Sequence, residues 1–355
     1  MKIISKSDFA FFLKTIFQSL QDVLPTSAEF DIYKQSLLST YDNASKELPV
    51  RQSVQLLNSM IYNNSPTAPA KHQALKNISH EDFLRFAQEV FKTTYTEALI
   101  YGNITSAEAA NIWGDLKTTL NAAPFVESKH YKQGVLSPAD KLGPYMVVQN
   151  TQRQGNCALL MLHEGAFSME KRAAQEILSN ALQDDFFNTL RTKQQTGYIA
   201  QSWGTEIERQ LLQFFAVQSN THQPSELLAR FELFLEGFSR HIDKKIPEER
   251  FETLKVSLIK ELEMPPETLS GKASEFYTLA FDYDADFDWV HKRVEAVKKL
   301  SYHDFLAISK TFLSRSNLKR LAVLMEGVLP EQNQFRYEVI QQDNVQDIGP
   351  YISYK

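Results

Sequence analysis

The sequence predicts an α+β fold made of two homologous units in tandem, each an antiparallel-rich sheet with helices packed on one face. Two observations lead to this prediction. Runs with strand-like character are followed by runs with helical periodicity, an order typical of α+β domains. Several of these segments also recur along the chain at a nearly constant offset. The length of 355 residues agrees with two domains, each large enough to bury a core.

In the first unit, helical periodicity dominates and one strand follows. The expected helices cover residues 5–22, 27–46, 50–62, 79–92 and 106–120, and the expected strand covers residues 95–102. Thr105, with Glu108 three residues later, predicts a capping box at the start of the last helix.

The second unit begins with strands and ends with helices and one more strand. Expected strands cover residues 145–149, 157–163, 197–204, 210–219 and 319–326, with a turn at 151–156. Expected helices cover residues 168–192, 224–243, 247–263, 267–281 and 302–314. Pro265 and Pro266 separate two of these helices, because proline cannot continue a helix from within.

The internal repeat is most visible at two nine-residue segments, Lys76–Leu84 (KNISHEDFL) and Lys298–Leu306 (KKLSYHDFL). Both contain Ser-x-x-Asp, a pattern typical of a helix start, and the aspartates Asp82 and Asp304 are 222 positions apart. Farther upstream, an offset of 221 matches Phe30, Lys34, Leu37 and Leu38 with Phe251, Lys255, Leu258 and Ile259. A near-constant offset over several elements predicts a duplicated unit.

The length of the repeat predicts the domain organisation. The chain holds about 1.6 such units, so the first unit is expected to be incomplete at its N-terminus. We expect the later part of one domain at residues 1–125, a linker at 126–144, and a complete domain at 145–355. Because a partial domain exposes apolar helix faces, self-association is a possible consequence.

Composition excludes several classes of protein. The net charge of −5 and the scattered lysines and arginines give no basic surface for nucleic acid or for an anionic membrane. No apolar run approaches the roughly 20 residues of a membrane span, and an amphipathic helix explains the N-terminus better than a signal peptide. A soluble protein is expected, whether cytoplasmic or periplasmic. The single cysteine, Cys157, excludes an internal disulfide and a cysteine-based zinc site.

The most informative segment is Phe186–Ala200, FFNTLRTKQQTGYIA, which spans the end of a helix and the start of a strand. Gly197 is expected to stop the helix because glycine can take positive φ. Arg191 then lies in the last turns of the helix and Tyr198 at the start of the strand, where both could point into one cleft. By spacing alone, Arg191 could instead complement the helix dipole and Tyr198 could be an ordinary core-edge residue.

This segment resembles FNTLRTKEQLGYI in the C-terminal half of the insulin-degrading enzyme and pitrilysin family, zinc metallopeptidases of the insulinase or inverzincin type. A second match, Glu97–Thr105 (EALIYGNIT), lies where the family has a similar strand ending in GNIT. The resemblance implies the fold of the insulinase and processing peptidases. It also implies that the chain covers the later part of the third and all of the fourth of four homologous domains.

By this resemblance, Arg191 and Tyr198 complete the active site from the half of the enzyme that lacks zinc. Tyr198 would donate a hydrogen bond to the scissile carbonyl, and Arg191 would hold the substrate main chain or support Tyr198. Gln194 and Thr196 replace the glutamate and leucine of the family, and both implied site residues are retained.

The chain lacks the pattern of a zinc site. The family binds zinc through H-x-x-E-H and a downstream glutamate, but no two histidines here are four positions apart. We therefore expect no metal ligands and no other cofactor site in this chain, and zinc bound by an N-terminal half of the enzyme. The chain alone is expected to be inactive.

Two functions remain open. The chain could be the substrate-binding half of a zinc metalloendopeptidase that encloses peptides, with its N-terminal catalytic half and a peptide substrate as partners. Alternatively, it could be a catalytically inactive structural or interaction subunit of an insulinase-like complex. The retained Arg191 and Tyr198 favour the first. Nucleic acid and membrane partners are not expected.

Overall fold

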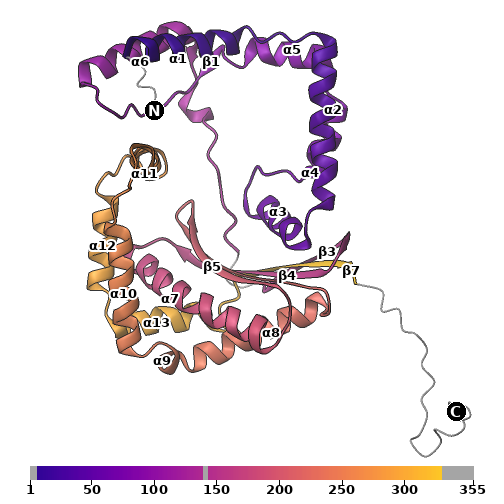
Figure 1. Ribbon diagram of the computed structural model, residues 1–355, viewed down its shortest axis with the longest axis vertical. Helices are drawn as coiled ribbons and strands as arrows, with labels where there is room; N and C mark the ends of the chain where they lie inside the picture. Colours follow the sequence, from indigo (N-terminus) through magenta and orange to yellow (C-terminus); the bar gives the residue numbers. More distant parts are fainter. Residues whose placement is uncertain (1–5, 139–142, 330–355) are drawn as a thin grey trace, which may run out of the picture.

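The first part of the chain is helical. The computed structural model describes residues 6–138 and 143–329 (Figure 1). Its elements up to residue 129 are α1 (Lys6–Gln21), α2 (Ser27–Asn43), η1 (Ala44–Lys46), α3 (Pro49–Ile61), α4 (Ala68–Lys76), α5 (His80–Glu89), β1 (Thr93–Thr94), α6 (Ser106–Leu120), β2 (Ala123–Pro124) and η2 (Glu127–Lys129). The helices predicted here are confirmed, and α4 is an additional one. The capping box of Thr105 and Glu108 is present.

The second part contains a sheet and most of the remaining helices. Its strands are β3 (Tyr145–Gln154), β4 (Asn156–Ala166), β5 (Ile199–Ile207), β6 (Gln210–Ser219) and β7 (Arg320–Val328). Its helices are α7 (Met169–Phe187), η3 (Asn188–Lys193), α8 (Pro224–Arg240), α9 (Ile242–Lys245), α10 (Glu248–Glu263), α11 (Leu269–Phe281), α12 (Trp289–Lys299) and α13 (Tyr302–Leu313). Helix α12 was not predicted. The turn predicted at 151–156 is wrong, because only Gly155 separates β3 from β4.

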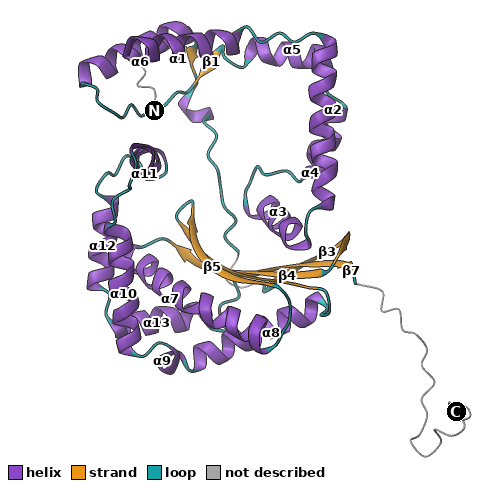
Figure 2. Ribbon diagram, viewed as in Figure 1, coloured by secondary structure: helices purple, strands orange, loops and turns teal. Residues whose placement is uncertain are grey.

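The five strands form one mixed sheet in the order β3-β7-β4-β6-β5 (Figure 2). β3 runs parallel to β7, whereas β4 pairs antiparallel with both β7 and β6, and β5 pairs antiparallel with β6. β3 and β4 are adjacent in sequence but not in the sheet, because β7 lies between them. The predicted α+β class is confirmed.

Both faces of the sheet are covered. On one face, α7, α8, α10 and α13 bury a core that includes Phe186, Phe215, Phe231 and Phe305. The other face packs against α3, where Leu57 and Ile61 contact Leu159, Phe214 and Val323. The cover of this second face therefore comes from the first part of the chain, about a hundred residues before the sheet begins (Figure 2).

The internal repeat is visible in matching contacts. The Lys34 ammonium donates a hydrogen bond to the Ile78 carbonyl (2.7 Å), as the Lys255 ammonium does to the Leu300 carbonyl (3.0 Å).

The aromatic packing of the two units matches as well. The ring of Phe30 lies 5.7 Å from that of Phe83, and the ring of Phe251 lies 5.0 Å from that of Phe305. Ser79 and Ser301 each cap the following helix through the aspartate three residues on. These contacts join residues at offsets of 221 or 222 positions and support the duplication.

The predicted strand at residues 95–102 is wrong. β7 is the corresponding segment in the second unit, and it is a strand because β3 and β4 pair with it on both sides. In the described part of the first unit, the only strands are the two-residue β1 and β2, which pair with each other. Without neighbouring strands, residues 95–102 have no ladder to join.

The packing of α3 on the sheet predicts a large stability difference between two isoleucines. Ile61 is 1% exposed, whereas Ile32 on α2 is 67% exposed. We expect Ile61→Ala to lower the free energy of unfolding by about 2–5 kcal/mol, because it leaves a cavity between α3 and the sheet. The matched control Ile32→Ala is expected to change it by no more than about 0.5 kcal/mol. Urea unfolding would measure both, and equal effects would contradict the packing described.

A buried carboxyl group predicts a pH dependence. Glu164 lies at a bulge of β4, between His163 and Gly165, and its Oε2 atom is buried without a hydrogen-bond partner among the described residues. Burial raises the pKa of the Glu164 carboxyl to about 7, with partial opposition from the charge of Lys171.

The folded state therefore holds a proton that the unfolded chain has lost above its ordinary pKa of about 4.5. The Glu164 contribution is complete below that value and is lost as the pH rises to about 7. We expect Glu164→Gln to abolish this loss, so that wild type and variant diverge in urea midpoint between these pH values. Parallel stability profiles would contradict the prediction.

Candidate functional site

Arg191 lies on an irregular helix end. After α7 the chain continues as a π-helical turn, Asn188–Lys193, and the Gln194 amide closes it by donating to the Thr189 carbonyl (3.0 Å). π-turns are rare and occur often at functional sites, because the extra residue turns side chains away from the regular helix register. The predicted place of Arg191, in the last turns of the helix, is confirmed.

The turn into the strand is built differently from the prediction. Gln195, at φ 51°, takes the left-handed conformation, and the glycine at 197 does not. Both the amide and the hydroxyl of Thr196 donate to the Leu190 carbonyl (3.0 and 2.9 Å) and end the helix. Gly197 is needed for close approach, since a Cβ there would lie 2.0 Å from the carbonyl oxygen of Gln218 on β6.

The side chains of Arg191 and Tyr198 meet. The guanidinium carbon of Arg191 lies 4.6 Å from the centre of the Tyr198 ring and 4.8 Å from the centre of the Phe187 ring. The cation is thus held against two aromatic rings, an arrangement that suits arginine. Tyr198 itself is 81% exposed and immediately precedes β5.

Phe187 is the site residue that sequence reasoning missed. By residue type and spacing Phe187 resembles the core residues Phe186 and Leu190, but those two are buried whereas Phe187 is 37% exposed. The sequence does place Phe187 four residues before Arg191, and two helical residues four apart lie on the same face. This spacing could have predicted their contact.

A cavity of about 610 Å³ opens beside these residues. It is lined by Gln183, Asp184, Phe187, Arg191 and the six consecutive residues Tyr198–Trp203. Side chains on a strand alternate between two faces, so consecutive residues can all line a cavity only where it follows the strand's edge. β5 is such an edge, since in the described sheet it pairs with β6 alone.

The electrostatics of the cavity favour a ligand with carbonyl or carboxylate oxygens. Within the described residues, no carboxylate forms an ion pair with Arg191, although Asp184 lines the same cavity. The guanidinium of Arg191 and the hydroxyl of Tyr198 are hydrogen-bond donors available to a ligand. The roles of these two residues in substrate binding stay a prediction.

The chain does not offer ligands for zinc in the part that the structure describes. No group of three or more histidine, cysteine or carboxylate side chains lies close enough there to hold a metal ion. His163 contacts Gln210 and His222 contacts Thr221, so both occupy polar contacts within the sheet and its loops. The described helices also include none long and apolar enough to cross a membrane.

Comparisons with known proteins find relatives in sequence and in fold. The family model described as PQQ synthase PqqF-like, C-terminal lobe domain 4, matches residues 177–277. An insulin-degrading enzyme of Drosophila melanogaster is 27% identical over 326 residues, which cover 90% of this chain and 32% of the relative. A nardilysin-like protein of Arabidopsis thaliana is 25% identical over 323 residues, covering 89% of this chain and 31% of the relative.

The solved structure of pitrilysin has the same fold. It aligns with a TM-score of 0.75 and 19% identity, covering 95% of this chain and 35% of pitrilysin. The chain is similar to members of the insulin-degrading enzyme and pitrilysin family. This is a family of zinc metallopeptidases. The chain spans about a third of the length of the family members that it matches.

The close approach at Gly197 predicts opposite effects for two glycine substitutions. Gly197→Ala places a methyl group against β6, so we expect a loss of about 1–3 kcal/mol in unfolding free energy and displacement of Tyr198. Gly237→Ala, inside α8 with open space around it, should stabilise by about 0.5–1 kcal/mol.

Urea unfolding measures both effects, and the fluorescence of Trp203, which lines the same cavity, reports on the site. A neutral Gly197→Ala variant would contradict the geometry.

Proposed function

We propose that this chain is the C-terminal, non-zinc half of a metalloendopeptidase that encloses and hydrolyses peptides. Arg191 and Tyr198 bind the substrate and stabilise the transition state. The observation that carries the proposal is the contact of the Arg191 guanidinium with Tyr198 beside the open edge of β5. The similarity of the chain to this family supports the reaction class.

The cavity suits a peptide in extended conformation. The edge of β5 presents main-chain groups along Ile199–Trp203, and an added strand can hydrogen-bond to such an edge regardless of its side chains. Arg191 and Tyr198 lie at the start of this edge, where they can donate to a carbonyl of the added strand.

Their chemistry fits peptide hydrolysis. Attack on a peptide carbonyl places negative charge on its oxygen, and the phenol of Tyr198 can donate a hydrogen bond to that oxygen. The guanidinium group of Arg191 adds positive potential at the same place. Phe187 restricts the guanidinium from its other side.

Zinc belongs to another part of the enzyme in this proposal. Bound zinc supplies an activated water and polarises the scissile carbonyl. The donor groups of the described residues do not fit such a site, so the N-terminal catalytic half would bring the metal to the substrate held here.

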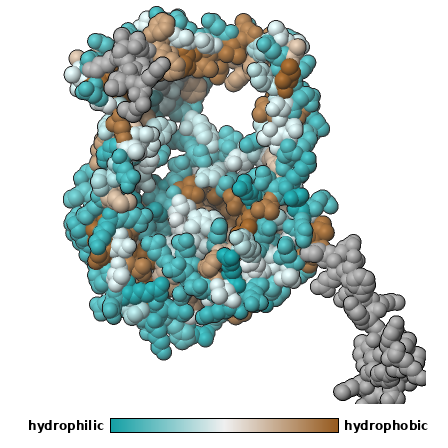
Figure 3. All heavy atoms as spheres, viewed as in Figure 1, coloured by the Kyte–Doolittle hydropathy of each residue, from teal (hydrophilic) through white to brown (hydrophobic). Residues whose placement is uncertain are grey.

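The first unit indicates how that partner attaches. α3 covers the sheet of the second unit, and α11 occupies the corresponding position in the repeat. The ring centres of Phe276 on α11 and Tyr101 in the first unit lie 5.0 Å apart. Apolar side chains remain exposed on the first unit and on α11, among them Phe11, Phe86, Tyr95 and Tyr277. Figure 3 shows hydrophobic surface along the helices of the first unit. A strand-rich segment of the kind formed by residues 145–219 would pair with residues 95–102 and cover these faces.

The same proposal includes the domain division. Residues 1–125 belong to one insulinase-like domain, residues 126–144 to a linker, and residues 145–355 to a second such domain, of which residues 330–355 lie outside the described part of the chain. The matching contacts of Lys34 and Lys255 support two related units. Self-association of the chain would be the alternative way to cover the exposed faces.

Peptide cleavage tests the function. The chain is combined with a polypeptide of the same protein that carries H-x-x-E-H, and cleavage of a fluorogenic peptide is followed with zinc present. We expect activity only in the mixture, with kcat/KM about 10²–10³ lower for Tyr198→Phe, because an oxyanion donor is lost. Arg191→Ala should lower kcat/KM as well.

Tyr33→Phe and Arg51→Ala are matched controls on exposed positions of α2 and α3, expected to leave kcat/KM unchanged. Activity of the chain by itself would overturn the proposal that zinc is bound by another part of the enzyme. A stable complex without activity would favour a structural subunit.

A further inference from the structure

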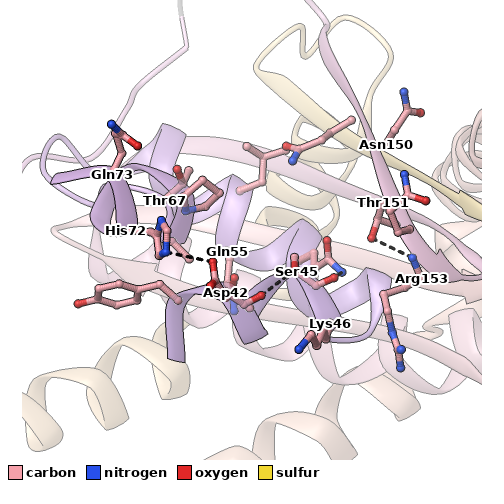
Figure 4. Close-up of a pocket in the computed structure, with 18 residues that line it drawn as sticks. Asp42, Ser45, Lys46, Gln55, Thr67, His72, Gln73, Asn150, Thr151 and Arg153 are labelled. Atoms are coloured by element: carbon pink, nitrogen blue, oxygen red, sulfur yellow. Dashed lines mark hydrogen bonds and ion pairs between the residues drawn. The ribbon is translucent and has the colours of Figure 1, made fainter. Parts of the chain in front are cut away.

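A second cavity lies at the opposite edge of the sheet from Arg191. Its volume is about 1110 Å³, and it is bounded by β3 on one side and by α2, η1, α3 and α4 on the other (Figure 4). In the sheet order β3-β7-β4-β6-β5, β3 and β5 are the two outer strands. Three strands, β7, β4 and β6, therefore lie between this edge and the edge of the proposed substrate site.

The cavity follows the edge of β3. Five consecutive residues, Gln149–Arg153, line it, so both faces of the strand contribute and the space must lie along the strand's side. The ladder between β3 and β7 is interrupted between Asn150 and Gln154, which leaves Thr151, Gln152 and Arg153 outside the pairing register. The Arg153 amide donates to the Thr151 hydroxyl (3.2 Å), and the main-chain groups of Thr151 and Gln152 are not committed to β7 as those of a regular strand would be.

The walls of the cavity are rich in free side-chain amides. Five amides line it without a hydrogen bond to any described residue: Gln55, Gln73, Gln149, Asn150 and Gln152. Each amide offers both a donor and an acceptor, as does every peptide unit of a ligand. Figure 4 shows amides and hydroxyls on opposite sides of the space, from α3 and α4 on one side and from β3 on the other.

The charges in the cavity favour an acidic ligand. Asp42 is paired with His72 (3.2 Å), so its carboxylate has a partner within the wall. The guanidinium of Arg153 makes no ion pair or hydrogen bond with a described residue, and Lys46 has only the neutral side chain of Asn43 (2.9 Å). Two cations are thus available beside an open strand edge.

We propose that the cleft between β3 and α2–α4 is a second binding site, which takes an extended acidic peptide segment as an added strand on β3. The main chain of the peptide pairs with Thr151–Arg153 and with the amides of the cleft. Its carboxylates face Arg153 and Lys46. The site does not use Arg191 or Tyr198, so its test is independent of the proposed peptidase function.

Binding of a defined peptide tests the proposal. The probe is a fluorescein-labelled decapeptide of alternating threonine and glutamate, titrated with the full chain and followed by fluorescence anisotropy. The comparison peptide alternates threonine and lysine. We expect the acidic peptide alone to bind, and hydrogen exchange of the amides in Gln149–Arg153 to slow when it is present.

Two variants separate charge from strand pairing. Arg153→Glu is expected to weaken binding by about fivefold or more, since a favourable charge contact becomes unfavourable. Lys310→Glu, at an exposed position of α13, makes the same change in net charge and should not alter binding. Gln152→Pro removes an edge donor at a residue outside the β7 ladder and should weaken binding while the urea midpoint is unchanged.

Several results would overturn the proposal: no binding of the acidic peptide, equal binding of the basic peptide, or slowed exchange at Ile199–Trp203 instead of β3. A chain ending at Leu329 is expected to bind the acidic peptide as the full chain does, and tenfold tighter binding would overturn the assignment of a separate peptide as the natural occupant. In that case residues 330–355 of the chain itself, rather than a separate peptide, would be the occupant of the cleft.

Discussion

The central sheet depends on burial of both its faces. β4 is buried almost without interruption from Asn156 to His163, which is possible only because α7 and α8 cover one face and α3 covers the other. The helix α3 comes from the first unit, so the two units are joined through a shared core rather than through a linker alone. A sheet buried in this way leaves its edges for ligands, and two cavities of the described chain lie along β5 and β3.

The two edges differ in what they present. At the edge of β5, one arginine lies against two aromatic rings. Its donors are close together, an arrangement that suits a single carbonyl group. The edge at β3 has distributed amides and two cations, which suit the main chain of a longer segment. This difference follows from the neighbouring elements, a π-turn beside β5 and the helices of the first unit beside β3.

The repeat explains much of the remaining structure. Lys34 and Lys255 occupy equivalent positions in the two units. Each donates a hydrogen bond to the carbonyl group just before the capping serine of a later helix. In the second unit the end of the repeat is the strand β7, because β3 and β4 pair with it. The described part of the first unit has no strands in the corresponding places. The equivalent residues 95–102 instead contact α11 through Tyr101, and their backbone is irregular.

Most of the helices could be predicted from the sequence, as could the α+β class, the internal repeat, and the place of Arg191 and Tyr198 around a helix-to-strand junction; α4 and α12 could not. These features depend on periodicity, capping and short motifs, which involve residues close together in the sequence. Only the tertiary structure decided that β7 separates β3 from β4, that α3 covers the second face, and that residues 95–102 are not a strand.

Strand pairing and face burial depend on partners far away in the chain, and the period of a segment does not specify them. The role of Gly197 belongs to the same class, since its close approach to Gln218 exists only once β5 and β6 have paired.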